Sequence, residues 1–187
     1  MAKRAEHVEH TRQRIIEAAV HLHGTVGPAA TTIAGIAEQA GVTRLTVYRH
    51  FADETALFAA CSAHWLSQQR PPDAQAWQEI AGPEQRLRFG LADLYRFYRD
   101  GEPMLRRIYG DIEALPAPHR DGLRSRDVRL RDVLLAPFGQ PRNRRLKALA
   151  GHAVAFSTWR SLCADNGLSH RDAVEAMVRL ILAEADR

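Results

Sequence analysis

The chain has little cysteine, and the cysteine that it has is not paired. Cys61 and Cys163 are its two cysteines, and they lie far apart without a Cys-x-x-Cys spacing. This arrangement excludes a disulfide framework and argues against a zinc site. We expect both thiols to be reduced and to behave as small hydrophobic side chains.

Long apolar runs, strand-like alternation and catalytic motifs are also missing. No run approaches the length of a membrane span, and residues 1–7 contain no apolar signal segment. We therefore expect a soluble, cytoplasmic protein without a membrane partner. No glycine-rich phosphate loop and no Gly-x-Ser-x-Gly motif occurs. The sequence accordingly predicts no enzyme activity, no cofactor and no metal site.

The net charge is only a weak guide to the partner. The chain has 26 basic and 22 acidic residues, and its formal charge is +4. An excess of this size hints at nucleic acid without establishing it. The placement of the charges is more informative than their total.

Residues 31–51 carry the pattern on which the interpretation depends. Apolar residues recur there at helical spacing in two short runs, which predicts two helices. These positions are Ile33, Ile36, Ala37 and Ala40, followed by Leu45, Val47, Tyr48 and Phe51. Thr32 and Thr43 can act as N-caps, and Gly41 suits the left-handed position after a helix end. The spacing predicts a helix-turn-helix.

The outward side of the second helix carries hydrogen-bond donors and no carboxylate. These residues are Thr43, Arg44, Thr46, Tyr48, Arg49 and His50. Such a face suits a polyanion, because guanidinium, hydroxyl and phenol groups all donate to phosphate oxygens. The alternative is an ordinary helical hairpin, which has no reason to keep its exposed face free of acids.

The remaining chain also reads as helices, and the expected fold class is all-α. Proline, glycine and N-capping residues divide it into segments. Besides the two helices above, we expect helices at about 4–23, 53–69, 83–100, 102–115, 118–136, 143–165 and 170–185, with a turn at Pro137–Pro141. Residues 1–52 are expected to form the helix-turn-helix domain, and residues 53–187 a larger domain.

The last two expected helices have broad apolar faces. One partner helix cannot cover so much apolar surface, which predicts a homodimer formed through a four-helix interface. The alternative is that both helices complete the core of a monomer.

The first fifty residues resemble the TetR family of bacterial transcriptional regulators. The matching positions are Arg14–Ala19, Gly24, Gly27, Thr32–Val42, Thr43–Phe51 and Leu57. The run Gly-Val-Thr-x-x-Thr-Val-Tyr-x-His-Phe is the most specific part, whereas the rest of the chain matches in length, helicity and helix order. The resemblance implies an N-terminal three-helix bundle with the helix-turn-helix, followed by a larger helical ligand-binding and dimerisation domain.

By position, the resemblance also implies which residues contact double-stranded DNA. Thr43, Arg44 and Thr46 would face the major groove, while Thr32, Tyr48 and His50 would hold phosphates. Arg44 is the best candidate for reading a base, since its guanidinium matches guanine. Leu45 would either touch a thymine methyl or pack within the protein.

One position departs from the family pattern. The family commonly has a lysine three residues after the phenylalanine, and this chain has Glu54 there. A carboxylate cannot contact phosphate, so this anchor is missing or has moved. Arg49 could replace it, as could Lys3 and Arg4 on a basic arm in the minor groove.

The resemblance further implies a small-molecule effector, whose identity the sequence does not reveal. Aromatic residues of the larger domain are the candidates for its pocket. They are Trp65, Phe97, Tyr109, Phe156 and Trp159. The resulting hypothesis is a dimeric repressor that an effector releases from a near-palindromic operator. The alternative is a helical small-molecule-binding or scaffold protein with weakened or lost DNA binding, for which Glu54 is the first indication.

Overall fold

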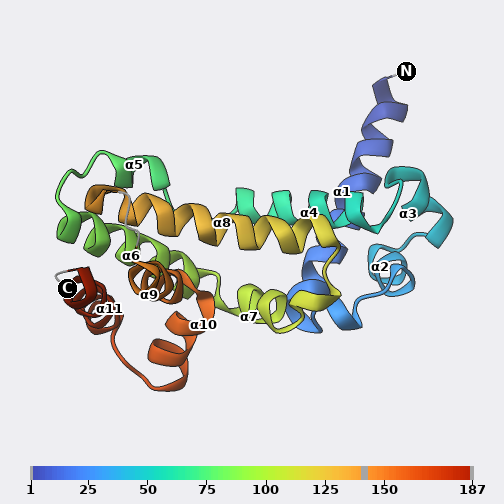
Figure 1. The fold of residues 1–187 in the computed structure, drawn as a ribbon. Helices are drawn as coiled ribbons and strands as arrows, with labels where there is room; N and C mark the ends of the chain where they lie inside the picture. The colour runs from blue at the N-terminus through green and yellow to red at the C-terminus, as the bar shows by residue number, and fades with distance from the viewer. Residues whose placement is uncertain (1, 140–142, 186–187) are drawn as a thin grey trace. The chain divides into compact units, whose positions relative to one another are not determined.

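The computed structural model describes residues 2–139 and 143–185, and every regular element within these ranges is a helix (Figure 1). The expected all-α class is thus confirmed. The end of the expected turn at Pro141 lies outside the described residues. In the part that is described, no helix is both long and apolar enough to cross a lipid bilayer.

The chain forms two compact units. The first contains the residues up to Gln69 together with Glu102–Asp121, and the second contains Arg70–Gly101 and the residues from Gly122 onward. The first unit therefore extends beyond the expected helix-turn-helix domain of residues 1–52. That functional boundary remains a prediction.

The first unit is built around its N-terminal helix. Its elements are α1 (Ala2–Thr25), the 3₁₀ turn η1 (Pro28–Ala30), α2 (Ile33–Ala40), α3 (Arg44–His50), α4 (Glu54–Ser67), α7 (Glu102–Gly110) and η2 (Ile112–Ala114). Helix α1 contacts α2, α4 and α7. Ile15 and Ala19 of α1 are fully buried, whereas Val8 near the start of the helix is exposed.

The second unit is organised around α6. Its elements are α5 (Ala74–Gln78), α6 (Pro83–Asp100), most of α8 (Ala117–Leu135), η3 (Ala136–Phe138), α9 (Arg144–Val154), α10 (Phe156–Trp159), a π-helical turn η4 (Arg160–Asp165) and α11 (His170–Ala185). Helix α6 contacts α5, α9, α10 and α11. Leu87, Leu91, Leu94 and Tyr95 on α6 have no exposed surface.

The single helix expected at 143–165 is wrong, because the chain breaks at Ala155. Ala155 is extended (φ −70°, ψ 136°) and separates α9 from α10. Two tyrosine hydroxyls of α6 donate to the carbonyls at the break, Tyr95 to Ala153 at 2.9 Å and Tyr98 to Val154 at 2.7 Å. These partners stabilise the break because they satisfy carbonyls that a continuous helix would bond internally.

Two further local expectations need correction. Helix α5 was not expected: Asp73 caps it, accepting from the backbone N–H groups of Gln75 and Ala76, both at 3.1 Å. In α4, helical spacing predicts that Ala56 faces the core together with Leu57, but Ala56 is exposed, and Phe58 and Cys61 are buried beside Leu57 instead. The apolar character of α4 extends around most of the helix, so spacing alone could not select the buried face.

Candidate nucleic-acid interface

Helix α2 and the following turn have the geometry that the sequence predicts. The Thr32 side chain accepts from the Gly35 N–H at 3.0 Å and caps the helix. Gly41 ends it in the left-handed region at φ 63°, where a glycine has no Cβ penalty. The guanidinium of Arg14 on α1 donates to the Ala40 carbonyl, and to that of Gly41 at 3.5 Å. Arg14 thus ties the turn to α1.

The role of Arg14 was missed from the sequence. The sequence places Arg14 in the first expected helix without indicating a partner for it, and only the fold brings the α2 carbonyls to it. The signal that pointed to Arg14 was its place at the start of the matched family pattern.

Helix α3 is fixed by one buried residue and one cap. Val47 is 1% exposed, and the Thr43 hydroxyl accepts from the Thr46 N–H at 3.2 Å. After the helix, Phe51 is buried, and the Arg12 guanidinium lies 5.3 Å from the centre of its ring. A short helix of seven residues would not persist alone, so these contacts set its orientation.

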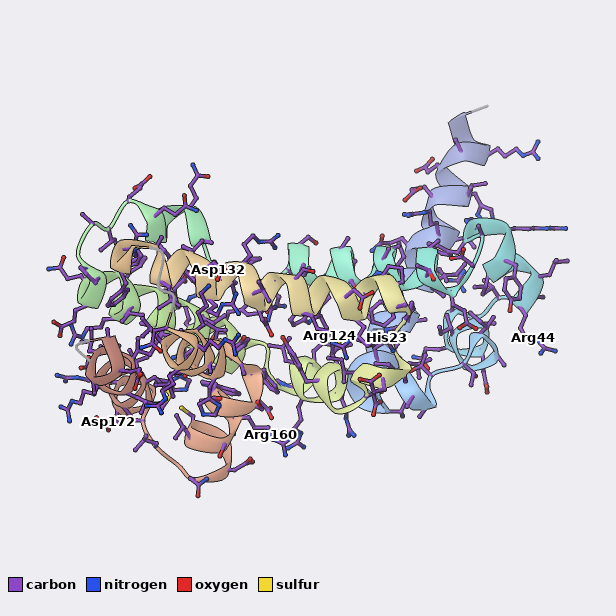
Figure 2. The ribbon with its side chains drawn as sticks, viewed as in Figure 1. His23, Arg44, Arg124, Asp132, Arg160 and Asp172 are labelled. Carbon is purple, nitrogen blue, oxygen red and sulfur yellow. The ribbon has the colours of Figure 1, made fainter. Side chains whose placement is uncertain are left out.

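The outer face of α3 is open to solvent. Thr43, Arg44 and Arg49 are exposed, and so are Leu45 (61%) and Tyr48 (52%). Arg44 extends away from the helix in Figure 2. Thr46 and His50, also predicted to contact DNA, are half-buried. Leu45 is therefore not part of the core, which leaves its side chain accessible to a partner.

Glu54 lies close to a residue expected to bind phosphate. A crevice of about 320 Å³ in the first unit is lined by both Thr32 and Glu54. Glu54 is exposed at the start of α4, where the helix dipole favours a carboxylate. Of the basic residues that could replace the family lysine, Arg4 and Arg49 are exposed, and the side chain of Lys3 lies outside the described residues.

Two neutral titratable groups lie between α1 and α4. His23 is 7% exposed, and burial lowers its pKa to about 4. Its Nδ1 lies 3.5 Å from the Cys61 Sγ, whose pKa is raised by burial to about 12. The His23 ring also packs against Phe58, with 5.0 Å between ring centres. Figure 2 shows His23 on α1. Both groups are uncharged near neutral pH, so the contact acts as part of the core.

The aromatic residues predicted to bind an effector lie in both units. Phe97, Phe156 and Trp159 are at most 3% exposed and gather around Tyr98 in the second unit, with ring centres 5.3–6.1 Å from that of Tyr98. Trp65 and Tyr109 are half-buried in the first unit. The assignment of these five side chains to a pocket stays a prediction.

The fold and the interface define an all-α protein with an N-terminal helix-turn-helix. Residues 15–61 match the model of the family described as bacterial regulatory proteins, tetR family. The match covers about a quarter of the chain, and within it this region is similar to these regulatory proteins.

A curated relative matches part of the chain. The HTH-type transcriptional regulator AcrR of Shigella flexneri is 39% identical over 57 residues, which are 30% of this chain. The match spans about a quarter (26%) of the length of that relative.

Solved structures extend the likeness of the fold to nearly the whole chain. A TetR-like transcriptional regulator from Rhodococcus sp. RHA1 has a TM-score of 0.64 at 21% identity, covering 92% of this chain and 93% of the other. NalD from Pseudomonas aeruginosa, the secondary repressor of the MexAB-OprM multidrug efflux pump, has a TM-score of 0.61 at 22% identity, with 96% and 97% covered. At such identities the likeness shows the fold alone.

Proposed function

We propose that this protein is a DNA-binding transcriptional regulator that inserts α3 into the major groove. The observation that carries the proposal is the outer face of α3, which is solvent-exposed, rich in donors and free of carboxylates. The buried Val47 and the Thr43 cap hold this face in place. The match of residues 15–61 to the tetR-family model and the 57-residue match to AcrR support the proposal.

Within this interface, Arg44 reads a base and other residues position the helix. The Arg44 side chain is exposed at the first position of α3, and its two-pronged guanidinium fits guanine O6 and N7. The exposed Leu45 contacts a thymine methyl group. Phosphates are held by Tyr48 and His50 and by the N-terminus of α2 at Thr32.

The regulator acts as a homodimer that pairs through α9 and α11, which lie in the two segments expected to form the last two helices. On α11, Leu180 is 39% exposed, and the small residues Ala176 and Ala183 share its side of the helix at spacings of four and three. On α9, Ala148 is exposed and Gly151 is half-buried. Small side chains allow two helices to pack closely, which favours a four-helix interface. The two α3 helices would then enter successive major grooves about 34–36 Å apart, on a near-palindromic operator.

The dimer is a repressor that a small molecule releases from DNA. NalD, which shares the fold, is named as a secondary repressor, and repression is the kind of regulation that we propose here. An effector bound among the helices after Asp53 needs a coupling free energy of only about 1–3 kcal/mol to weaken DNA binding severalfold or more.

A second function is favoured by Glu54, whose carboxylate shares a crevice with Thr32. Repulsion of phosphate at this place would suit a helical ligand-binding or scaffold protein that has lost DNA binding. Gel-shift titrations with purified protein at two salt concentrations separate the two functions. A regulator gives complexes that weaken steeply as salt rises, because phosphate contacts release counterions. A dimer that shifts no DNA at low salt would overturn the regulator and support the scaffold.

A further inference from the structure

A groove of about 840 Å³ lies along α8 in the second unit, next to the end of α5. A volume of this size is typical of small-molecule sites. The five aromatic residues predicted as effector contacts are not among its lining residues. The groove is therefore separate from the pocket that the sequence predicts.

A buried positive charge lines this groove. Arg86 is 8% exposed, and it donates to the carbonyls of Ile80 and Gln78, both at 2.8 Å, and of Val133 at 3.2 Å. These bonds use three of its N–H groups, and a guanidinium has about five. Within the described residues no carboxylate pairs with it. Carbonyl dipoles compensate such a buried charge only in part, so the site favours an anion.

Two further arginines of α8 line the groove. Arg129 is exposed and forms no ion pair with any residue that the structure describes, and Arg124 lies beside it in the lining. The single carboxylate of the lining, Asp132, accepts from Arg131 at 2.7 and 2.9 Å. Figure 2 shows Arg124 and Asp132 on α8. Because Asp132 is already paired with an arginine outside the lining, the groove keeps a positive potential.

The groove also has an apolar surface on a fixed frame. Val128 is 47% exposed and Val133 is half-buried, and both belong to the lining. Helix α5 is held on α6 by Trp77, which is fully buried and donates through Nε1 to Asp93 at 3.0 Å. An exposed valine among arginines suits a ligand that is part apolar and part anionic.

We propose that this α5–α8 groove binds a small organic anion with an apolar body. The anionic group, a carboxylate in the simplest case, lies on the guanidinium groups of Arg86 and Arg129. The apolar body lies on Val128 and Val133. Arginine suits this role because its planar guanidinium can donate two parallel hydrogen bonds to a carboxylate.

Titration calorimetry on the full chain without DNA tests the proposal, so a failure of DNA binding would not affect it. The probe is 4-phenylbutyrate, and its neutral amide, 4-phenylbutanamide, is the matched control ligand. We expect the acid to bind and the amide to bind at least about tenfold more weakly, since charge-assisted hydrogen bonds are the stronger ones.

Three variants locate the binding on the protein. Arg129→Glu and Val128→Asp change exposed residues of the lining, and each should weaken binding of the acid about tenfold or more. Arg144→Glu makes the same charge change at an exposed residue of α9 and should leave binding unchanged. Arg86 is not substituted, because its hydrogen bonds connect α5 to α8.

Several outcomes would overturn the proposal. They are absence of binding by the acid at millimolar concentration, equal binding of acid and amide, and equal effects of Arg129→Glu and Arg144→Glu. Self-association of the protein that Val128→Asp abolishes, without binding of the acid, would show instead that a second copy covers the groove.

Discussion

At the scale of single residues, the interface combines side chains that build it with side chains that are free to bind. Val47 and Arg14 are engaged inside the first unit, and the exposed Thr43 caps α3, whereas Arg44 and Tyr48 extend into solvent. We therefore expect the first group to govern folding and the second to govern recognition of DNA. Substitutions in the two groups should have different effects, and the predictions for single residues follow from this division.

Arg44→Ala should weaken binding to a specific site by about 1–3 kcal/mol and relax the preference at one base pair. Stability should hardly change, because the side chain is exposed. Arg106→Ala removes an exposed arginine of α7 in the same unit and is the control. Gel shifts with a matched and a singly mismatched site measure both effects. An equal loss in the two variants would argue against base reading by Arg44.

Glu54→Lys should strengthen DNA binding, since it replaces a carboxylate near Thr32 by an amine that can contact phosphate. The slope of log affinity against log salt should steepen by about 1. The same change at Glu17, an exposed residue of α1, should have little effect. Gel-shift titrations over a series of salt concentrations provide the slopes. Unchanged affinity in Glu54→Lys would place this residue away from the DNA.

His23 should make the protein less stable at mildly acidic pH. Burial lowers its folded pKa to about 4, below the ordinary histidine value of 6.5, so the unfolded state binds the proton first as pH falls. The stabilising effect of the neutral ring is complete above pH 6.5 and declines toward pH 4. Urea unfolding should show a loss of about 2 kcal/mol between pH 7.5 and pH 5 that is absent in His23→Gln. A loss of the same size in the variant would assign the pH dependence to other groups.

At the scale of elements, the sequence predicts most helices and their caps, because those signals are local. Asp53 caps α4 by accepting from the Ala56 N–H at 2.7 Å, and Ser169 caps α11 by accepting from the Asp172 N–H at 3.1 Å. The break at Ala155 could not be predicted, because the groups that stabilise it, Tyr95 and Tyr98, come from a distant helix. Similarly, the α2 carbonyls reach Arg14 only through the fold.

Substitution by alanine should have opposite effects at two helical glycines, because only one of them lies where α5, α6 and α8 meet. A Cβ at Gly90 would lie 2.5 Å from Leu134 Cδ2 and 3.0 Å from Trp77 Cδ2, so Gly90→Ala should cost about 1–3 kcal/mol. At Gly122 in α8, a Cβ would meet no atom of the described residues within 4 Å. Gly122→Ala should therefore stabilise by up to about 1 kcal/mol. Denaturant unfolding of both variants tests this, and a stable Gly90→Ala would show that α5 shifts easily.

At the scale of the whole molecule, the proposal requires two copies of the chain. Leu180→Glu places a charge on the exposed side of α11 and should convert the dimer to monomers at micromolar concentration, since burying an unpaired charge opposes pairing. Leu168, at 36% exposure just before α11, supplies the control in Leu168→Glu, which should stay dimeric. Sedimentation velocity distinguishes the species. A Leu180→Glu dimer would exclude this face from the interface.

Sequencing of the DNA that the purified protein selects from a random pool tests the central claim most directly. If α3 of each subunit reads the major groove, the selected sites should contain two inverted half-sites with centres about 10 base pairs apart, or a multiple of that spacing. Arg44→Ala should lose the preference at one position in each half-site while keeping the spacing. A pool that shows no enriched sequence, or the same enriched sequence for the protein and for Arg44→Ala, would contradict the claim.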